Sequence, residues 1–285
     1  MRICRANNDW FLVEGEDAFA ITAHVRAAAP EGEGDALLRA LPHLPPAATL
    51  RQGPRHRFAD LALQSPVSAP TKILAAPNNF RAHSSEMASD AAANAGRMGT
   101  VHEAGFFLKA NSSLVGPSEG IAQRFLDRRT DHEGEFVIVI GRTVARELAP
   151  ADAWSAVAGY SLGLDITLRG AEERSLRKSI DSYTVLGPCL VTPDELPEIG
   201  AIRTWLAVNG EIRQDTLLSE LVVGVAEMIA YASRFYTLYP GDLIYAGSPS
   251  GVGPIRPGDM LHAEGTGLGA MDVKVRAWVP EACAP

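Results

Sequence analysis

The sequence predicts an α+β protein in which short strands outnumber helices. Apolar or alternating runs of four to nine residues recur along most of the chain and are separated by turns rich in Gly and Pro, which is typical of β-structure. Only a few segments carry the spacing of an amphipathic helix. With 285 residues and 46% hydrophobic content, the chain is long enough to bury a sizeable core.

Residues 1–66 are predicted to form a small N-terminal α/β domain, and residues 67–285 a larger second domain. The N-terminal part contains two candidate strands, at residues 10–14 and 19–25. A short helix is expected to begin near Asp35, because Asp favours the N-terminal cap position. Pro42, Pro45 and Pro46 then end the helical pattern.

The larger domain is predicted to be mostly β. An apolar run at 136–140 indicates a buried strand, and Asn209-Gly210 is typical of a tight hairpin turn. Helices are expected at 150–159, where Pro150 is near the first turn, and at about 219–236, where apolar residues recur at helical spacing. The remaining strands are expected near residues 73–76, 105–109, 160–169, 186–191, 204–208, 243–246, 260–263 and 271–279.

Composition excludes several classes of function. The chain has 26 Lys and Arg against 34 Asp and Glu, a formal net charge of −8, which argues against nucleic acid or an anionic membrane as the main partner. No apolar run has the length of a membrane span. The three cysteines are scattered, which fits a reducing cytoplasm and gives no zinc spacing. The glycine clusters near residues 247 and 265 do not open a helix, so neither predicts a phosphate-binding loop.

Three carboxylates form a candidate metal site. Glu133 and Glu135 stand two apart at the start of a predicted strand, so their side chains are expected on one face. Asp165 lies inside another apolar strand and needs a partner if it is buried. A hard divalent cation shared by all three would stabilise them. The alternatives are a polar strand end with solvated acids, and an Asp165 that caps a turn or pairs with Arg169.

His83 and Glu86 form a candidate general base. They are three residues apart, so on one helical turn the carboxylate would orient the imidazole and raise its basicity. The alternative is a surface His near a Glu. The Ala-, Asn- and Gly-rich segment 89–100 is predicted to be mobile. Most of the charged run 170–181 is expected to be a solvated helix or loop.

Taken together, these features resemble the fumarylacetoacetate hydrolase family over roughly residues 70–279. Each motif alone is weak, but their order along the chain is specific. The motifs are Asn79-Phe-Arg-Ala-His83-Ser-Ser-Glu86, Phe107-Leu-Lys109, Asp131-His-Glu133-Gly-Glu135, Gly159-Tyr-Ser-Leu-Gly-Leu-Asp165-Ile-Thr-Leu-Arg169, Lys178-Ser, Gly187-Pro, Asn209-Gly-Glu-Ile-Arg-Gln, Pro240-Gly-Asp and Gly247-Ser-Pro-Ser-Gly-Val-Gly.

The resemblance implies a fold and a site. The fold would be a curled mixed β-sheet with peripheral helices, forming a catalytic domain that is usually dimeric and binds Mg²⁺ or Mn²⁺. Position by position, the implied residues are Glu133, Glu135 and Asp165 for the metal, His83, Glu86 and Lys178 for catalysis, and Lys109, Arg169 and Ser248 around the substrate. Three positions depart from the family pattern: Phe80 replaces a common Tyr, Ser248 a common Thr and Glu172 a common Gln.

The implied activity is a hydrolase that cleaves a carbon–carbon bond of a 2,4-dioxo acid, an acylpyruvate such as fumarylpyruvate, in aromatic catabolism. A homodimer in the cytoplasm is expected. Two alternatives use the same metal and enolate: an oxaloacetate decarboxylase, and an isomerase or hydratase of 2-oxo-dienoic diacids. A catalytically idle small-molecule binder is a third, which the presence of His83, Glu86 and all three carboxylates argues against.

Overall fold

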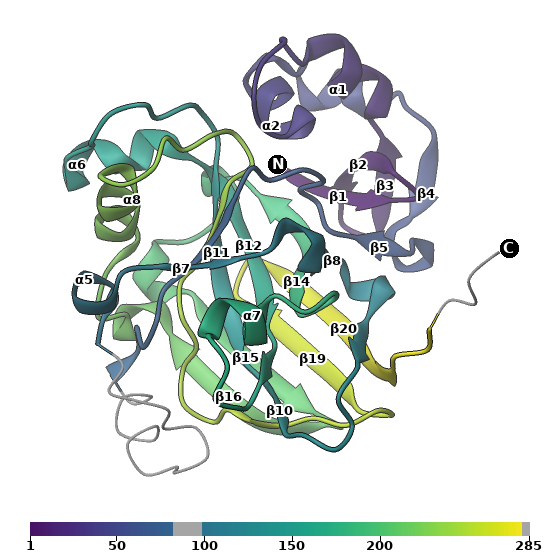
Figure 1. Cartoon of the computed structure of the whole chain (residues 1–285). Helices are drawn as coiled ribbons and strands as arrows, with labels where there is room; N and C mark the ends of the chain where they lie inside the picture. The colour runs from purple at the N-terminus through teal and green to yellow at the C-terminus, as the bar shows by residue number, and fades with distance from the viewer. Residues whose placement is uncertain (82–98, 281–285) are drawn as a thin grey trace, which may run out of the picture.

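A large mixed sheet forms the centre of the molecule (Figure 1). The structure is a computed structural model that describes residues 1–81 and 99–280. Within these residues the sheet has twelve strands. Ten of them follow one spatial order: β4 (Arg55–Arg57), β3 (Asp17–Ala20), β2 (Asp9–Glu14), β1 (Arg2–Ala6), β14 (Thr184–Val191), β12 (Val157–Asp165), β11 (Gly134–Ile140), β17 (Leu243–Tyr245), β6 (Ile73–Ala75) and β7 (Phe107–Lys109). Beside this path, β5 (Leu63–Gln64) pairs with β1 and β8 (Leu114–Val115) with β14.

Two smaller sheets complete the β-structure of the described residues. One has five strands in the order β16 (Glu211–Leu217), β15 (Arg203–Val208), β19 (Met260–Gly265), β20 (Gly269–Ala277) and β9 (Ile121–Gln123). The other has three strands, β13 (Thr167–Leu168), β10 (Thr130–His132) and β18 (Gly253–Pro254). Parallel pairs such as β17–β6 and β20–β9 occur among antiparallel ones. The prediction of a mostly β fold with mixed sheets is therefore confirmed.

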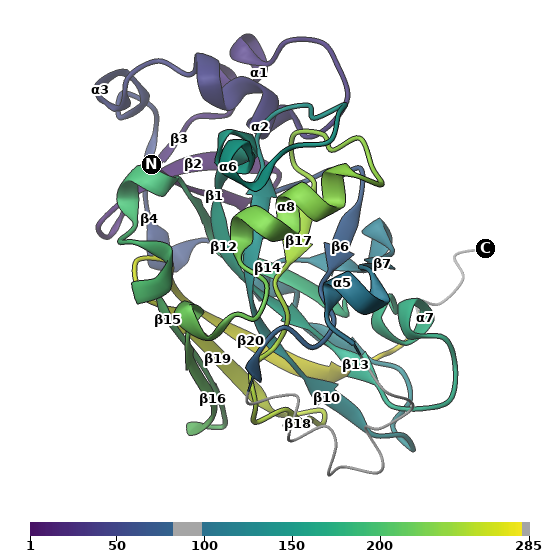
Figure 2. The same ribbon diagram turned by 90° about the vertical axis from the view of Figure 1, so that its left-hand side faces the viewer.

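The helices of the described residues are peripheral, as expected, and they are short. They are α1 (Thr22–Ala28), α2 (Ala36–Ala40), α3 (Ala47–Leu50), α5 (Val101–Ala104), α6 (Pro150–Ala153), α7 (Arg174–Lys178) and α8 (Val225–Ser233). Figure 2 shows α8 across one face of the large sheet. The Asp35 carboxylate accepts the Leu37 amide hydrogen at 2.9 Å, which confirms a helix start at this residue. No described helix is long and apolar enough to cross a membrane.

The core lies on both faces of β11. Successive side chains of a strand point to opposite faces, so Phe136 and Ile138 pack with Met228 of α8 in one buried cluster. Val137 and Val139 point the other way, into a second cluster that holds the N-terminal helices. Burial on both faces explains why residues 136–140 of β11 are continuously apolar.

The N-terminal segment extends the large sheet. Strand β1 pairs antiparallel with β14, with Ile3 opposite Leu190, so residues 1–66 and the later strands share one ladder. The division of the chain at residues 66 and 67 stays a prediction.

Two expected helices are shorter than predicted. The first ends at Ala153, and β12 starts at Val157, where pairing with β11 takes over the backbone hydrogen bonds. The second begins only at Val225. The Asn79 side chain accepts a hydrogen bond from the Val223 amide, 144 residues away in sequence, and the Asn79 carbonyl accepts one from the Val222 amide. These long-range hydrogen bonds prevent the helix from starting earlier.

Candidate metal centre and active site

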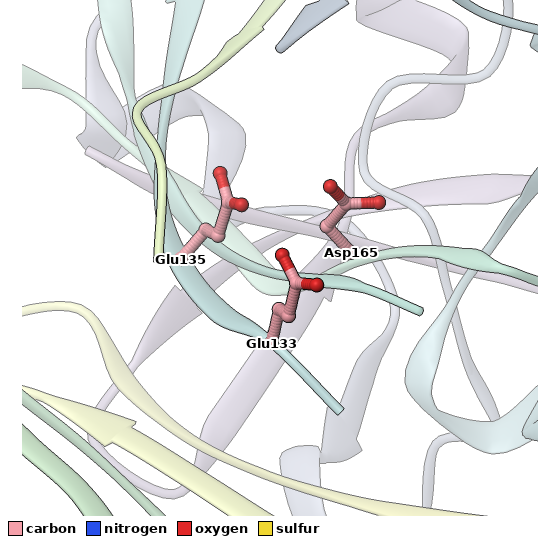
Figure 3. A group of neighbouring side chains, drawn as sticks. All are labelled: Glu133, Glu135 and Asp165. Atoms are coloured by element: carbon pink, nitrogen blue, oxygen red, sulfur yellow. The ribbon is translucent and has the colours of Figure 1, made fainter. Parts of the chain in front are cut away.

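Glu133, Glu135 and Asp165 come together where two strands of the large sheet end. Glu133 lies between β10 and β11, and its carbonyl accepts the Asp165 amide hydrogen at 2.8 Å from the last residue of β12. Figure 3 shows the three carboxylates pointing toward one another. One oxygen from each lies within 4.8 Å of the others, and all three residues are buried. The alternatives of solvated acids and of an Asp165 paired with Arg169 are therefore wrong.

Two lysines and one arginine supply the opposite charge. Lys178 of α7 donates to Glu133 at 2.9 Å and to Asp165 at 2.7 Å. Lys109, at the end of β7, also donates to Asp165 and donates to the Tyr183 carbonyl at 2.9 Å. Arg169 reaches Glu133 at 3.4 Å. Paired in this way, the charges can be buried without the full cost of isolated ions.

The pKa values of the two glutamates are shifted in opposite directions. Burial raises the pKa of Glu133, but the charges of Lys178 and Arg169 outweigh it and lower the pKa to about 2. Burial raises the pKa of Glu135 well above its usual value, and the charge of Asp165 raises it further. Glu135 accepts the Gly247 amide hydrogen at 2.8 Å, which only partly opposes this rise. Glu135 is therefore the carboxylate that most needs a cation.

The two lysines also differ. Burial lowers the pKa of Lys178, but Asp165 and Glu133 outweigh it and leave the pKa raised, so its ammonium is retained. Burial lowers the pKa of Lys109 more than Asp165 raises it, and the charge of Lys178 lowers it further. One lysine is therefore a fixed cation of the site, while the other is more easily neutralised.

Arg169 and Ser248 lie at the border of this cluster. Arg169 is held by Asp131, which accepts its Nε hydrogen at 2.8 Å. Ser248 is buried, and its hydroxyl donates to the Gly134 carbonyl at 3.3 Å. It follows Gly247, whose φ of 95° favours glycine and aims the amide at Glu135. The structure thus gathers Lys109, Arg169, Lys178 and Ser248 around the three carboxylates.

Gln214 of β16 is buried, and no role was predicted for it from the sequence. Its Oε1 accepts the Gly134 amide hydrogen at 2.8 Å and lies 3.2 Å from Nδ1 of His132, and its Nε2 donates to Ser248 Oγ at 2.8 Å and to the Pro249 carbonyl at 2.9 Å. Both lone pairs and both amide hydrogens are used. Burial lowers the pKa of His132, which favours its neutral form. Gln214 therefore joins the metal-site strand to the loop of Ser248. The ordered motif from Asn209 to Gln214 was the only signal for it.

Asp131 and Thr167 were also missed. Asp131 is fully buried and holds Arg169, while the Thr167 hydroxyl donates to Glu133 at 2.7 Å and accepts from Lys178 at 2.6 Å. Asp131 is a buried carboxylate that orients Arg169, and Thr167 orients the Glu133 carboxylate and the Lys178 ammonium. Lys178 itself is buried, as is Arg177, so this end of the charged run is not solvated as predicted.

The proposed general base lies outside the described residues. His83 and Glu86 fall within 82–98, and so does most of the segment 89–100 that was predicted to be mobile. Their roles stay predictions.

The donor set fits a hard divalent cation. Glu133, Glu135 and Asp165 offer only carboxylate oxygens, which Mg²⁺ and Mn²⁺ prefer, and the raised pKa of Glu135 marks a position that lacks positive charge. Among the residues that the structure describes, this cluster includes no sulfur or imidazole ligand of the kind that zinc favours.

Comparison with known proteins identifies the family. The model of the fumarylacetoacetate (FAA) hydrolase C-terminal family matches residues 72–276. Maleylpyruvate hydrolase of Aquipseudomonas alcaligenes is 45% identical over 97% of this chain and 100% of that protein. The crystal structure of maleylpyruvate hydrolase from Sphingobium sp. SYK-6 with manganese(II) and pyruvate has a TM-score of 0.83 and 32% identity, covering 98% of this chain and 100% of that one. A 5-carboxymethyl-2-hydroxymuconate delta-isomerase from Mycobacterium smegmatis has a TM-score of 0.72 and 25% identity, covering 97% and 100%. The chain therefore belongs to the fumarylacetoacetate hydrolase family.

Proposed function

We propose that this protein is a metal-dependent hydrolase that cleaves a carbon–carbon bond of an acylpyruvate, a 2,4-dioxo acid, to pyruvate and a carboxylic acid. The observation that carries the proposal is the convergence of Glu133, Glu135 and Asp165, with ligand oxygens within 4.8 Å of one another. The similarity to two maleylpyruvate hydrolases, one crystallised with manganese(II) and pyruvate, supports it.

The three carboxylates would hold Mg²⁺ or Mn²⁺. When bound, the ion supplies Lewis-acid stabilisation of the negative charge that develops on the pyruvate half. Lys178, kept cationic beside Glu133 and Asp165, adds a fixed positive charge to the same region. Lys109, Arg169 and Ser248 are proposed to contact the substrate around this centre.

Hydrolysis needs a base for water, and we assign that role to His83 with Glu86 as its orienting partner. His83 takes a proton from water, and the water oxygen bonds to the distal carbonyl carbon at C4. The C3–C4 bond then breaks, its electron pair stays on C3 of the pyruvate half, and C3 takes up a proton. The acyl half leaves as a carboxylic acid, so water is the only co-reactant.

The proposed setting is a cytoplasmic homodimer that acts in aromatic catabolism on a small-molecule 2-oxo acid. The net charge of −8 supports a partner that is neither a nucleic acid nor an anionic membrane. The two-domain division at residues 66 and 67 belongs to the same proposal.

A product assay tests the function. Purified protein, stripped with a chelator and reloaded with Mg²⁺ or Mn²⁺, is incubated with a panel of acylpyruvates, oxaloacetate and a 2-oxo-dienoic diacid. We expect pyruvate from the acylpyruvates, dependence on the metal, and no turnover by Glu133→Ala. Faster release of CO₂ from oxaloacetate would establish the decarboxylase instead. Faster isomerisation of the dienoic diacid would establish the reaction named for the Mycobacterium smegmatis relative.

A further inference from the structure

Asp131 is a fully buried carboxylate of β10 that lies between two arginines. Its Oδ1 accepts the Nε hydrogen of Arg129 at 2.7 Å, and its Oδ2 accepts the Nε hydrogen of Arg169 at 2.8 Å. These are the short distances of charge-assisted hydrogen bonds. Each carboxylate oxygen therefore holds one guanidinium, and the buried negative charge is compensated from both sides.

Arg169 is fixed through its backbone as well as through its side chain. Its amide donates to the Arg129 carbonyl at 2.8 Å, and its carbonyl accepts from the Arg128 guanidinium at 2.9 Å. With the backbone held in this way, only the side-chain torsions of Arg169 are left free. The bond from Nε to Asp131 then restricts these torsions and sets the direction in which the guanidinium points.

The contact of Arg169 with Glu133 is the weaker of its two ionic contacts. Nη2 of Arg169 lies 3.4 Å from Oε1 of Glu133, and this oxygen already accepts the Thr167 hydroxyl at 2.7 Å. A guanidinium that is free to turn pairs with a carboxylate through two parallel hydrogen bonds of about 2.8 Å. Asp131 therefore holds Arg169 in a position where it does not form such a pair with Glu133.

This arrangement has two consequences for the metal centre. Glu133 is one of the three carboxylates that can hold the cation, and a guanidinium paired with both of its oxygens would compete with the ion for the same lone pairs. Nη1 of Arg169 has no hydrogen-bond partner within the described residues, so its hydrogens stay available to a carboxylate that binds beside the metal.

We propose that Asp131 is a positioning residue that holds Arg169 away from Glu133, so that Glu133 stays available to the metal and Arg169 to the 2-oxo acid. Asp131 acts only through Arg169 in this scheme. The inference rests on the proposed function, because that function assigns the metal to Glu133 and a substrate contact to Arg169. Binding of the metal alone requires no substrate, so it tests the role of Asp131 separately from the reaction.

A double-mutant cycle tests the coupling between Asp131 and Arg169. Calorimetric titration with Mn²⁺ is carried out on metal-free wild type, Asp131→Asn, Arg169→Met and the double variant. Asn keeps the size of the side chain but has one carbonyl oxygen for two arginines. We expect Asp131→Asn alone to weaken Mn²⁺ binding by about 10-fold. In the Arg169→Met background the same change should alter the Kd by less than about twofold, because no arginine remains to pair with Glu133.

Oxalate, which stands in for the 2-oxo acid, reports the orientation of Arg169. At saturating Mn²⁺ we expect Asp131→Asn to weaken oxalate binding by about 10-fold. The control Asp242→Asn changes another fully buried carboxylate, which accepts from Lys72 and Thr71 rather than from a residue of the site. It should leave the affinities for Mn²⁺ and oxalate near those of wild type.

The outcomes separate this inference from the proposed function. A wild-type Mn²⁺ Kd in Asp131→Asn would overturn the positioning role, and so would an equal loss with and without Arg169. If Asp131→Asn does not fold, Arg169→Met decides: its Mn²⁺ Kd should stay within about threefold of wild type, because Arg169 is already held off, and a tenfold or tighter Kd would overturn the proposal. A protein that shows the expected coupling but hydrolyses no acylpyruvate would overturn the proposed function alone.

Discussion

Binding of the metal should release a proton from Glu135. Burial and the charge of Asp165 raise the pKa of this carboxyl well above its usual value of 4.5, so the metal-free protein holds a proton there at pH values where a free glutamate is already ionised. A cation bound to the carboxylate must displace that proton. Affinity is therefore expected to rise with pH, and to stop rising once the pH exceeds the raised pKa.

The size of the effect follows from linkage. If each ion releases one proton, the apparent Kd falls about tenfold for each unit that the pH rises. This change corresponds to about 1.4 kcal/mol of binding free energy. Glu133 should add nothing in this range, because its pKa of about 2 leaves it ionised already. The window in which affinity changes lies between the usual and the raised pKa of Glu135.

Titration calorimetry with Mn²⁺ measures the proton directly. At each pH, the binding heat is compared in buffers of different ionisation enthalpy, and the slope gives the number of protons released. For wild type we expect the release of up to one proton per ion just above pH 4.5, falling to none once the pH passes the raised pKa of Glu135. In Glu135→Gln we expect weaker Mn²⁺ binding and no proton release from position 135. A Kd that is independent of pH, or equal proton release from Glu135→Gln, would refute the reasoning, and the second result would point to Lys109 as the source.

Three further changes test the remaining contacts. Glu133→Ala should abolish tight Mn²⁺ binding. It should also lower the free energy of unfolding of the metal-free protein by about 3 kcal/mol, because Lys178 and Arg169 each lose an anionic partner. Urea unfolding measures this loss, and unchanged stability would contradict the prediction. Gln214→Leu should destabilise the protein by about 2–4 kcal/mol, since the Gly134 amide and the Pro249 carbonyl lose their partner, whereas Thr216→Val on the same strand should cost much less; equal losses would argue against the network. His83→Ala should lower kcat for acylpyruvates by about 10²- to 10⁴-fold while Mn²⁺ and oxalate affinities stay near wild type, and wild-type turnover would remove His83 as the base.

The sequence alone indicated that the three carboxylates could form one site. Glu133 and Glu135 are two residues apart at the start of an apolar strand, and a period of two places their side chains on one side whatever the rest of the fold does. Asp165 could be recognised because a carboxylate in an apolar strand requires a partner. The ordered motifs indicated the family, and the Asn209-Gly210 pair marked a hairpin in which both residues have positive φ.

The tertiary structure decided how these charges are stabilised. From spacing alone, Glu133 and Glu135 are two acids that repel. Nothing local indicates that Lys178 contacts both Glu133 and Asp165, or that Lys109 contacts Asp165. Lys109 contacts Asp165 across 56 residues of sequence, and Gln214 contacts Gly134 across 80. Such contacts depend on how the sheets pack, so no local pattern encodes them.

The same limit explains the errors in the helices and in the charged run. The apolar spacing before Val225 predicted a helix, but the Val222 and Val223 amides donate hydrogen bonds to Asn79 instead of to a preceding helical turn. The charged run at 170–181 was expected to be solvated, yet Lys178 and Arg177 are buried because carboxylates and carbonyls from other strands surround them. A charge run is solvated only where the fold brings no opposite charge to it, and that is a property of the tertiary structure.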